Sequence, residues 1–119
     1  QQDAGYRNTS RWTWNSEAAR LNYNWARWTP NLSPGTYEVQ VFVPLASATT
    51  TNARYEIAHA NEFTTRVVNQ LANRGAWVSL GTYFFEGSVE EYVSLSDVTF
   101  EPRLSTMVAF DAVQWIPQR

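Results

Sequence analysis

Residues 36–44 read Thr-Tyr-Glu-Val-Gln-Val-Phe-Val-Pro, and this stretch decides the fold class. Tyr37 and the three valines that follow it occupy every second position, so their side chains share one face of an extended strand. Glu38 and Gln40 alternate with them and belong to the opposite face. Pro44 ends the strand because proline has no N–H group to donate to a neighbouring strand. The stretch therefore predicts a β-strand with one buried face.

Further strands are predicted on either side of this one. Residues 76–85 are apolar on both faces, as in a central strand that is buried between two layers. Residues 91–96 predict a short strand, and residues 107–116 predict a last strand that is nearly continuous in apolar residues. Seven or eight short strands separated by turn residues are typical of an antiparallel sandwich. We therefore predict an all-β fold, an antiparallel β-sandwich.

Residues 53–59 and 63–70 predict a hairpin. We expect a three-residue loop of Asn61, Glu62 and Phe63, because a two-residue loop would place Ile57 beside Arg66.

Length and composition limit the possible functions. The 119 residues are enough for one domain, residues 1–119, and the start Gln-Gln-Asp suggests a piece of a longer extracellular protein. Absence of cysteine excludes disulfides and thiolate catalysis. No apolar stretch is long enough for membrane insertion. All nine basic residues are arginine and the net charge is −2, so we expect no nucleic-acid partner.

Aromatic residues gather near the N-terminus. Four of the six tryptophans fall within the first 28 residues, where arginine and asparagine separate them: Trp12, Trp14, Trp25 and Trp28. Flat apolar rings beside fork-shaped hydrogen-bond donors are typical of surfaces that bind sugars, bases or peptides. Core packing is the alternative for each ring. The sequence leaves both interpretations open for Trp14 and Trp25.

A set of segments, in a fixed order along the chain, resembles a known family. The segments are Trp28-Thr-Pro, Pro34-Gly-Thr-Tyr-Glu-Val, Thr51-Asn-Ala-Arg-Tyr, His59-Ala60, Val68-Asn-Gln, Trp77-Val-Ser-Leu-Gly-Thr-Tyr, Val93-Ser-Leu-Ser and Ala109-Phe-Asp-Ala-Val-Gln-Trp. They resemble the golvesin C-terminal-like family, also called the xanthan-lyase-associated domain. The resemblance implies a jelly-roll sandwich like that of galactose-binding domains. It also implies that the domain is an accessory part of bacterial extracellular proteins and that its role is attachment to carbohydrate or to the cell envelope.

The family pattern divides the tryptophans into two groups. Trp12, Trp28 and Trp77 have counterparts in the pattern, which favours a structural role, whereas Trp14 and Trp25 have none. We therefore expect the ligand-binding residues to be Trp14, Trp25, Tyr23, Arg20, Arg11 and Asn24. Arginine pairs with carboxylate through two hydrogen bonds, so this set favours an acidic polysaccharide.

No catalytic constellation or cofactor is predicted. His59 is the sole histidine and lies on an apolar face, where a structural hydrogen bond is the expected role. Asp111 stands among apolar residues, where a carboxylate needs a partner. The partner is an arginine, backbone N–H groups, or a structural calcium shared with Asp3. The adjacent Glu90 and Glu91 point to opposite faces and cannot act as a glycosidase pair. We expect a protein that is not an enzyme.

Three functions remain. The first is binding of a polysaccharide or cell-envelope glycan. The second is a structural domain that packs against a neighbouring domain of the parent protein. The third is binding of single-stranded nucleic acid, which the net charge and the absence of lysine disfavour. A binding site with convergent polar groups favours the first, and an apolar patch without them favours the second.

Overall fold

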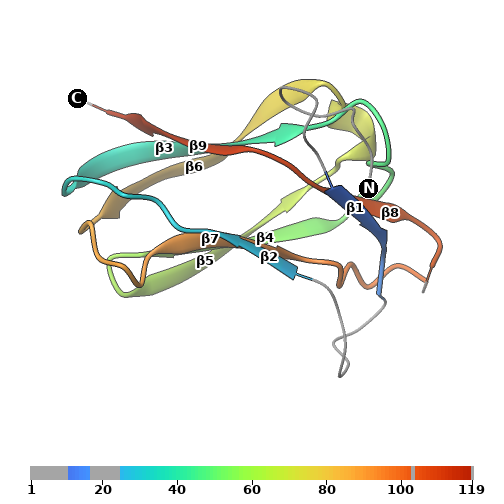
Figure 1. The fold of residues 1–119 in the computed structure, drawn as a ribbon, viewed down its shortest axis with the longest axis horizontal. Helices are drawn as coiled ribbons and strands as arrows, with labels where there is room; N and C mark the ends of the chain where they lie inside the picture. The colour runs from blue at the N-terminus through green and yellow to red at the C-terminus, as the bar shows by residue number, and fades with distance from the viewer. Residues whose placement is uncertain (1–10, 17–24, 103, 119) are drawn as a thin grey trace.

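The computed structural model describes residues 11–16, 25–102 and 104–118 (Figure 1). Within them are nine β-strands and one short 3₁₀ helix, η2 (Leu71–Asn73). The strands are β1 (Arg11–Trp14), β2 (Trp25–Trp28), β3 (Gly35–Val43), β4 (Ala53–His59), β5 (Glu62–Val68), β6 (Ala76–Phe85), β7 (Tyr92–Ser96), β8 (Met107–Phe110) and β9 (Val113–Pro117). No helix among these residues is long and apolar enough to cross a membrane.

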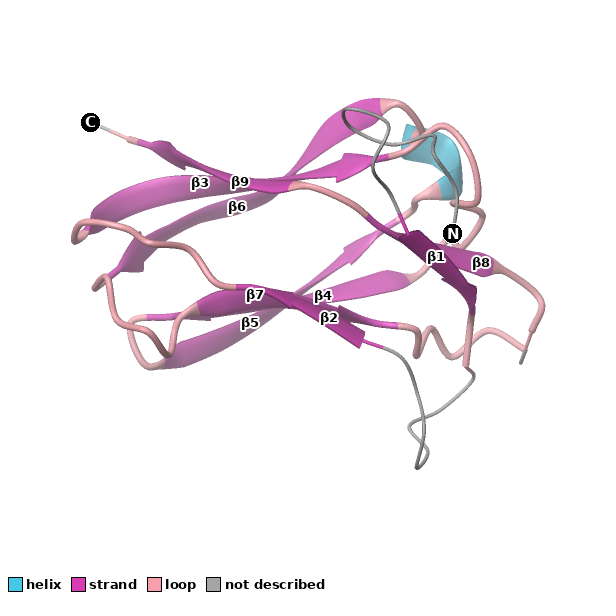
Figure 2. Ribbon diagram, in the orientation of Figure 1, coloured by secondary structure: helices cyan, strands magenta, loops and turns pink. Residues whose placement is uncertain are grey.

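The described strands form antiparallel sheets that pack against each other. One sheet has the order β2-β7-β4-β5 and a second has the order β6-β3-β9, while β1 pairs with β8. Figure 2 shows the four-stranded and three-stranded sheets as two layers, with the β1-β8 pair at one end of the molecule. Every strand pairing is antiparallel. The predicted all-β class is confirmed.

The core lies between the two layers. Val39, Val41 and Val43 of β3 are fully buried, as the alternation in residues 36–44 predicts, and β3 ends at Val43 before Pro44. Ile57 of β4 and Leu95 of β7 are equally buried and belong to the same apolar cluster. Complete burial of such a side chain stabilises the fold by about 1.5–3 kcal/mol. The alternation in β3 therefore determines which face of this strand packs against the other sheet.

The position of β6 differs from the prediction. Residues 76–85 do form a strand, but among the described residues it pairs with β3 alone and is an edge strand rather than a central one. The apolar residues on its outer face, Trp77 and Phe84, are partly exposed instead of covered by another layer. A bulge interrupts the register opposite Val39 and Gln40, where Gly81 has a φ of 109°. Edge strands commonly carry such bulges.

The hairpin loop is shorter than predicted. His59 pairs with Glu62, so the loop contains only Ala60 and Asn61. Both have positive φ angles, 46° and 63°, which is the backbone of the tightest hairpin turns. The expected three-residue loop is therefore wrong. The resulting register places Ile57 opposite Thr64 rather than opposite Arg66.

The predicted last strand is broken in two. Asp111 and Ala112 separate β8 from β9 because the chain changes partners there, from β1 to β3. The backbone N–H of Phe42 donates to the Ala112 carbonyl across 2.9 Å at this point. Asp111 therefore lies in a break between strands and not within one.

A buried asparagine closes the β1-β8 end of the molecule. Asn15 follows β1 directly and is fully buried. Its Nδ2 donates to Thr99 Oγ1 at 2.9 Å, and its Oδ1 accepts the backbone N–H groups of Ser105 and Thr106 at 2.9 and 3.0 Å. It also donates to two backbone carbonyls at positions 101 and 102. One side chain therefore fastens the N-terminal strand to the loop before β8.

Candidate functional site

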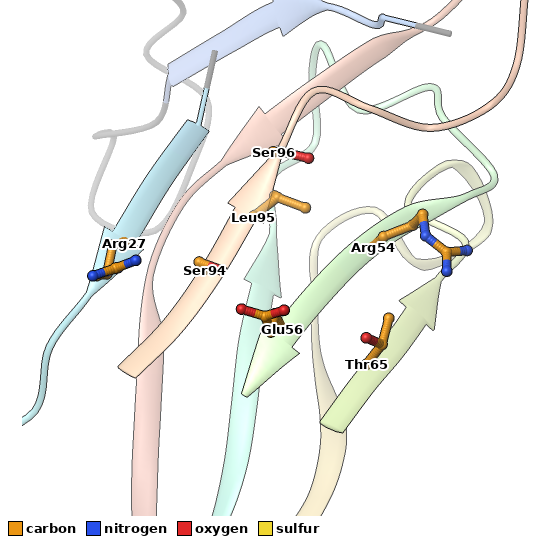
Figure 3. Close-up of a pocket in the computed structure, with 7 residues that line it drawn as sticks. All are labelled: Arg27, Arg54, Glu56, Thr65, Ser94, Leu95 and Ser96. Carbon is orange, nitrogen blue, oxygen red and sulfur yellow. The ribbon is translucent and has the colours of Figure 1, made fainter. Parts of the chain in front are cut away.

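A polar hollow crosses the outer face of the four-stranded sheet. Its volume is about 450 Å³ and it is open to solvent (Figure 3). Its lining residues come from all four strands: Arg27, Arg54, Glu56, Thr65, Ser94, Leu95 and Ser96. We call this hollow the trough.

The strand register explains why these side chains converge. Arg27 of β2 lies opposite Ser94 of β7, Ser94 lies opposite Glu56 of β4, and Glu56 lies opposite Thr65 of β5. Residues that are directly opposite in neighbouring strands point to the same face of a sheet. A single row of polar side chains therefore runs across the whole outer face.

The depth of the trough comes from the residue types on β7. Ser94 and Ser96 point outward from this strand, while Val93 and Leu95 point into the core. Serine is short, and the flanking strands carry the long side chains of Arg27 on one side and Glu56 and Arg54 on the other (Figure 3). Strands are spaced by about 4.8 Å, so these walls rise from backbones that are roughly 10 Å apart.

Tyr92 links the two walls at one end of the trough. The guanidinium carbon of Arg27 lies 3.8 Å from the centre of the Tyr92 ring, within the range of a cation–π contact. The Tyr92 hydroxyl donates to Glu56 Oε1 at 3.0 Å. Burial raises the pKa of Tyr92, and the neighbouring Glu56 raises it further. Tyr92 is therefore a neutral platform at physiological pH and is not activated as a base.

The second arginine of the trough also contacts a ring. The guanidinium carbon of Arg54 lies 5.2 Å from the centre of the exposed Phe100 ring. Arg27 and Arg54 are thus both held by aromatic faces while they line the trough. Two arginines and one glutamate give these lining residues a charge of +1 (two positive charges and one negative), although the chain as a whole carries −2.

The residues expected from the sequence are only partly placed. Trp14 ends β1 with 46% of its surface exposed, and Arg11 begins the same strand. Trp25 begins β2, opposite Ser96 of the trough. Because β1 and β2 belong to different sheets, Arg11 and Trp14 do not share a sheet with Trp25. Tyr23, Arg20 and Asn24 lie outside the described residues.

None of the described residues that line the trough was among the ligand-binding residues expected from the sequence, and Tyr92 was missed as well. Arg27 stands within the aromatic N-terminal stretch, but Glu56 and Tyr92 are far from it along the chain. One feature of the sequence could have predicted part of this region. In β7, Tyr92, Ser94 and Ser96 occupy every second position and alternate with buried residues. That pattern marks an outward polar face but does not say which strands lie beside it.

The remaining tryptophans divide between core and surface. Trp28 is partly buried and packs against the apolar core, in agreement with the structural role expected for it, and Trp115 packs there as well. Trp77 differs, because it pairs with Phe42 on the outer face of the three-stranded sheet, with ring centres 5.4 Å apart.

The structural role expected for His59 is confirmed, and Gln70 has a similar one. His59 is buried, its Nε2 lies 2.9 Å from Thr64 Oγ1, and its ring packs on Tyr83 at 4.5 Å. Gln70 is fully buried and bonds both backbone groups of Ala109 at 3.0 Å, as well as the Tyr55 hydroxyl at 3.1 Å. Both side chains satisfy buried groups and neither lines the trough.

No metal site is found among the described residues, where no three His, Cys, Asp or Glu side chains are grouped to hold an ion. Asp3, the suggested partner of Asp111 in a calcium site, lies outside that part of the chain. Asp111 is half-buried and contributes to the raised pKa of Tyr55, after the larger effect of burial.

Comparison with known proteins identifies the family. The model of the Golvesin C-terminal domain family matches residues 1–116. The chain belongs to this family. The family resemblance stated from the sequence is thereby confirmed.

This golvesin C-terminal domain is similar to part of the solved structure of a Paenibacillus xanthan lyase. The TM-score is 0.68 at 24% sequence identity, and the match covers 93% of this chain. It covers only 12% of the lyase chain, so the golvesin C-terminal domain corresponds to a small segment of that protein. The likeness shows a shared fold. No curated protein matches the chain.

A buried carboxylate lies directly before β7 of this golvesin C-terminal domain. Glu91 precedes Tyr92 and is 4% exposed. Its two oxygens accept the backbone N–H groups of Ala60 and of residues 86–88, at 2.8 to 2.9 Å. Burial alone would raise the pKa of Glu91, but these four donors outweigh it and lower the pKa. The carboxylate therefore ties the β4-β5 turn to the turn before β7 and fixes where β7 begins.

Proposed function

We propose that this golvesin C-terminal domain is a non-catalytic module that binds carbohydrate or cell-envelope glycan for a larger bacterial extracellular protein. The observation that carries the proposal is the trough, where polar side chains from four strands converge and where Tyr92 contacts two of them, Arg27 and Glu56, at one end. Binding sites combine a few placed polar groups with an aromatic surface. The neutral Tyr92 and the structural role of His59 support binding rather than catalysis.

The similarity to a segment of a Paenibacillus xanthan lyase supports this role. A small segment of a xanthan lyase is a suitable place for a module that attaches the enzyme to its substrate. We extend the proposal to secretion of the parent protein and to a jelly-roll topology like that of galactose-binding domains. We also keep Trp14, Trp25, Tyr23, Arg20, Arg11 and Asn24 as proposed ligand-binding residues.

Affinity electrophoresis in gels that contain polysaccharides tests the proposal. Wild-type protein is expected to migrate more slowly in at least one of a set of neutral and acidic polymers. Ser94→Tyr fills the trough with an outward ring and is expected to restore free migration. Thr82→Tyr places the same ring on the exposed outer face of β6 and serves as the matched control.

The result for Trp14→Ala and Trp25→Ala tells whether the residues expected from the sequence extend the site. If either variant is retarded less than the wild-type protein, the substituted residue belongs to the site. If the variant is retarded as much as the wild-type protein, the residue lies outside it. Unchanged migration of the wild-type protein in every polymer contradicts glycan binding.

The second candidate function is packing against a neighbouring domain of the parent protein. It is favoured by the outer face of the three-stranded sheet, where Phe84 is 50% exposed and Phe42 and Trp77 are half-buried. Such a face offers apolar area without convergent charged groups. In the parent protein, Phe84→Ser is expected to loosen such packing, which small-angle X-ray scattering would detect as a larger radius of gyration.

A further inference from the structure

An exposed phenylalanine stands beside the trough in a backbone conformation that bulky side chains disfavour. Phe100, in the loop between β7 and β8, is 60% exposed and has a φ of 62°. The centre of its ring lies 5.2 Å from the guanidinium carbon of Arg54, which lines the trough. We infer that Phe100 extends the trough as a stacking platform, and that the ligand is a glycan chain with one sugar unit in the trough and the next on this ring. This inference rests on the proposed glycan binding and narrows it to chains of more than one unit.

Packing in the core does not explain the conformation of Phe100. At positive φ the Cβ atom of an L-residue crowds the following carbonyl oxygen, so glycine and asparagine adopt this region readily and a bulky residue is an outlier there. Such strain persists only where neighbouring contacts impose it, and it gathers at binding sites. The side chain that is held in this way mostly faces water instead of apolar neighbours. Contact with a ligand is therefore the role that fits this residue.

Hydrogen bonds on both sides of Phe100 impose its conformation. The backbone carbonyl of Thr99 accepts the side-chain amide of Asn52. The carboxylate of Glu101 accepts the hydroxyl of Thr51 at 3.1 Å. Both donors lie directly before β4, a strand that lines the trough. The ring is therefore held in place beside the trough before a ligand arrives, which reduces the entropy that is lost on binding.

The two faces of the Phe100 ring have different neighbours. Arg54 lies over one face, within the range of a cation–π contact. Because 60% of the residue is still exposed, the opposite face is open to a ligand. A sugar ring has C–H groups on its face and hydroxyls at its edge, so it can cover an aromatic ring while its hydroxyls reach polar neighbours. Glu56, Thr65 and Ser96 offer such neighbours in the trough, and an apolar protein partner would remove them from water without new hydrogen bonds.

The position of Phe100 sets the smallest ligand that can use it. Phe100 contacts Arg54 and lies beside the trough rather than in its lining. On β4, Arg54 and Glu56 are two residues apart, so their backbones are separated by about 7 Å (Figure 3). A ligand that stacks on Phe100 and also bonds Glu56 extends across Arg54 as well as this interval. A single sugar ring is too small for that, so linked units are needed.

Competition in affinity electrophoresis tests the inference. The whole 119-residue chain is run in gels that contain dextran, hydroxyethylcellulose, polygalacturonate or xanthan, and a polymer that retards it is chosen. Single sugars and linear oligosaccharides of increasing length, made from that polymer, are then added as competitors. Dissociation constants are compared between the wild-type protein, Phe100→Asn, which removes the ring, and Phe100→Tyr, which keeps it.

The wild-type protein is expected to bind the longer oligosaccharides about tenfold more tightly than the single sugar, equivalent to about 1.4 kcal/mol. Phe100→Asn is expected to lose this gain while it binds the single sugar like the wild type, and Phe100→Tyr is expected to retain the gain. Because asparagine tolerates positive φ, the midpoint of urea unfolding of Phe100→Asn should equal or exceed that of the wild type. A residue that served only the fold would shift this midpoint downward.

Leu104→Asn is the matched control. Leu104 belongs to the same loop, has a φ of 61° and is 50% exposed, but it is not among the residues that line the trough. The same substitution therefore relieves the same kind of backbone strain at a position away from the proposed platform. Leu104→Asn is expected to bind every oligosaccharide like the wild type and to keep its urea midpoint.

The remaining outcomes decide against the inference. If Phe100→Asn binds oligosaccharides as tightly as the wild type, or if single sugars compete as well as chains, the inference is overturned and glycan binding stands. Equal losses of affinity in Phe100→Asn and Leu104→Asn also overturn it, because they assign the effect to the loop and not to the ring. A lower urea midpoint for both Phe100→Asn and Phe100→Gly makes the ring a part of the fold and overturns it as well. If no polymer retards the wild-type protein, the inference and the proposed function fall together.

Discussion

Glu91 offers the sharpest test of how the structure is held together. In Glu91→Gln the shape of the side chain is kept, but one carboxylate oxygen becomes an NH₂ group. Each oxygen of Glu91 accepts two backbone N–H groups, so in either amide orientation two donors face another donor. A buried donor without an acceptor costs about 1–3 kcal/mol. The expected loss is therefore about 2–6 kcal/mol.

A loss of that size is a large part of the 5–15 kcal/mol that stabilises a typical domain. Urea unfolding at pH 7 measures it as a lower midpoint with an unchanged slope. The matched control is Glu90→Gln, the same change at the exposed neighbouring position, for which we expect a change within about 0.5 kcal/mol.

Acid titration gives an independent check of the same contact. The pKa of Glu91 is lowered in the folded state from its ordinary value of 4.5. Its stabilising contribution is thus complete above pH 4.5 and is lost as the pH falls through the folded-state pKa. The difference between wild type and Glu91→Gln should shrink over that range. A Glu91→Gln protein that is as stable at pH 7 as Glu90→Gln would refute the reasoning.

Three further predictions concern the core and the hairpin. Gln70→Ala leaves both buried backbone groups of Ala109 without partners and is expected to cost about 2–5 kcal/mol in urea unfolding, against less than about 0.5 for the exposed Gln118→Ala. Burial raises the pKa of Tyr55 above its ordinary 10.0, so stability should fall as the pH rises above that value. Absorbance at 295 nm should then show Tyr55 ionising only on unfolding, and ionisation in the folded state would contradict this. Ala60→Asn places a residue that tolerates positive φ in the hairpin turn and is expected to raise the thermal midpoint by the equivalent of about 0.5–1 kcal/mol; a lower midpoint would count against the turn geometry.

The strand that defines the core was predictable because its signal is local. In residues 36–44 every second side chain is buried, and burial of one strand face needs no knowledge of its neighbours. The fate of residues 76–85 was not predictable in this way. Trp77 and Phe84 look like core residues in sequence, but they lie on an outer face that no other described sheet covers. Apolar character alone does not tell a covered face from an uncovered one.

The candidate site was harder to predict than the fold. The sequence drew attention to residues that are close together along the chain, such as Trp14 and Trp25, and the structure assigns these to different sheets. The trough joins Arg27, Ser94 and Glu56, which become neighbours only through the strand order β2-β7-β4. Strand order depends on pairings between distant segments, which one sequence does not specify. The family and the β-sandwich fold could therefore be predicted from the sequence. The grouping of the trough's side chains could not.

Asn15 has a consequence for how the domain is made in the cell. Its hydrogen-bond partners lie in residues 99–106, and β1 pairs with β8, which follows them. A ribosome releases the N-terminal strand long before these partners exist. Until then the side chain of Asn15 and the edge of β1 have only water, chaperones or other nascent chains to bind. Completion of the sandwich therefore waits until residues 99–106 have been synthesised, and the rate of this last closure sets how long the nascent domain is exposed to aggregation and proteolysis.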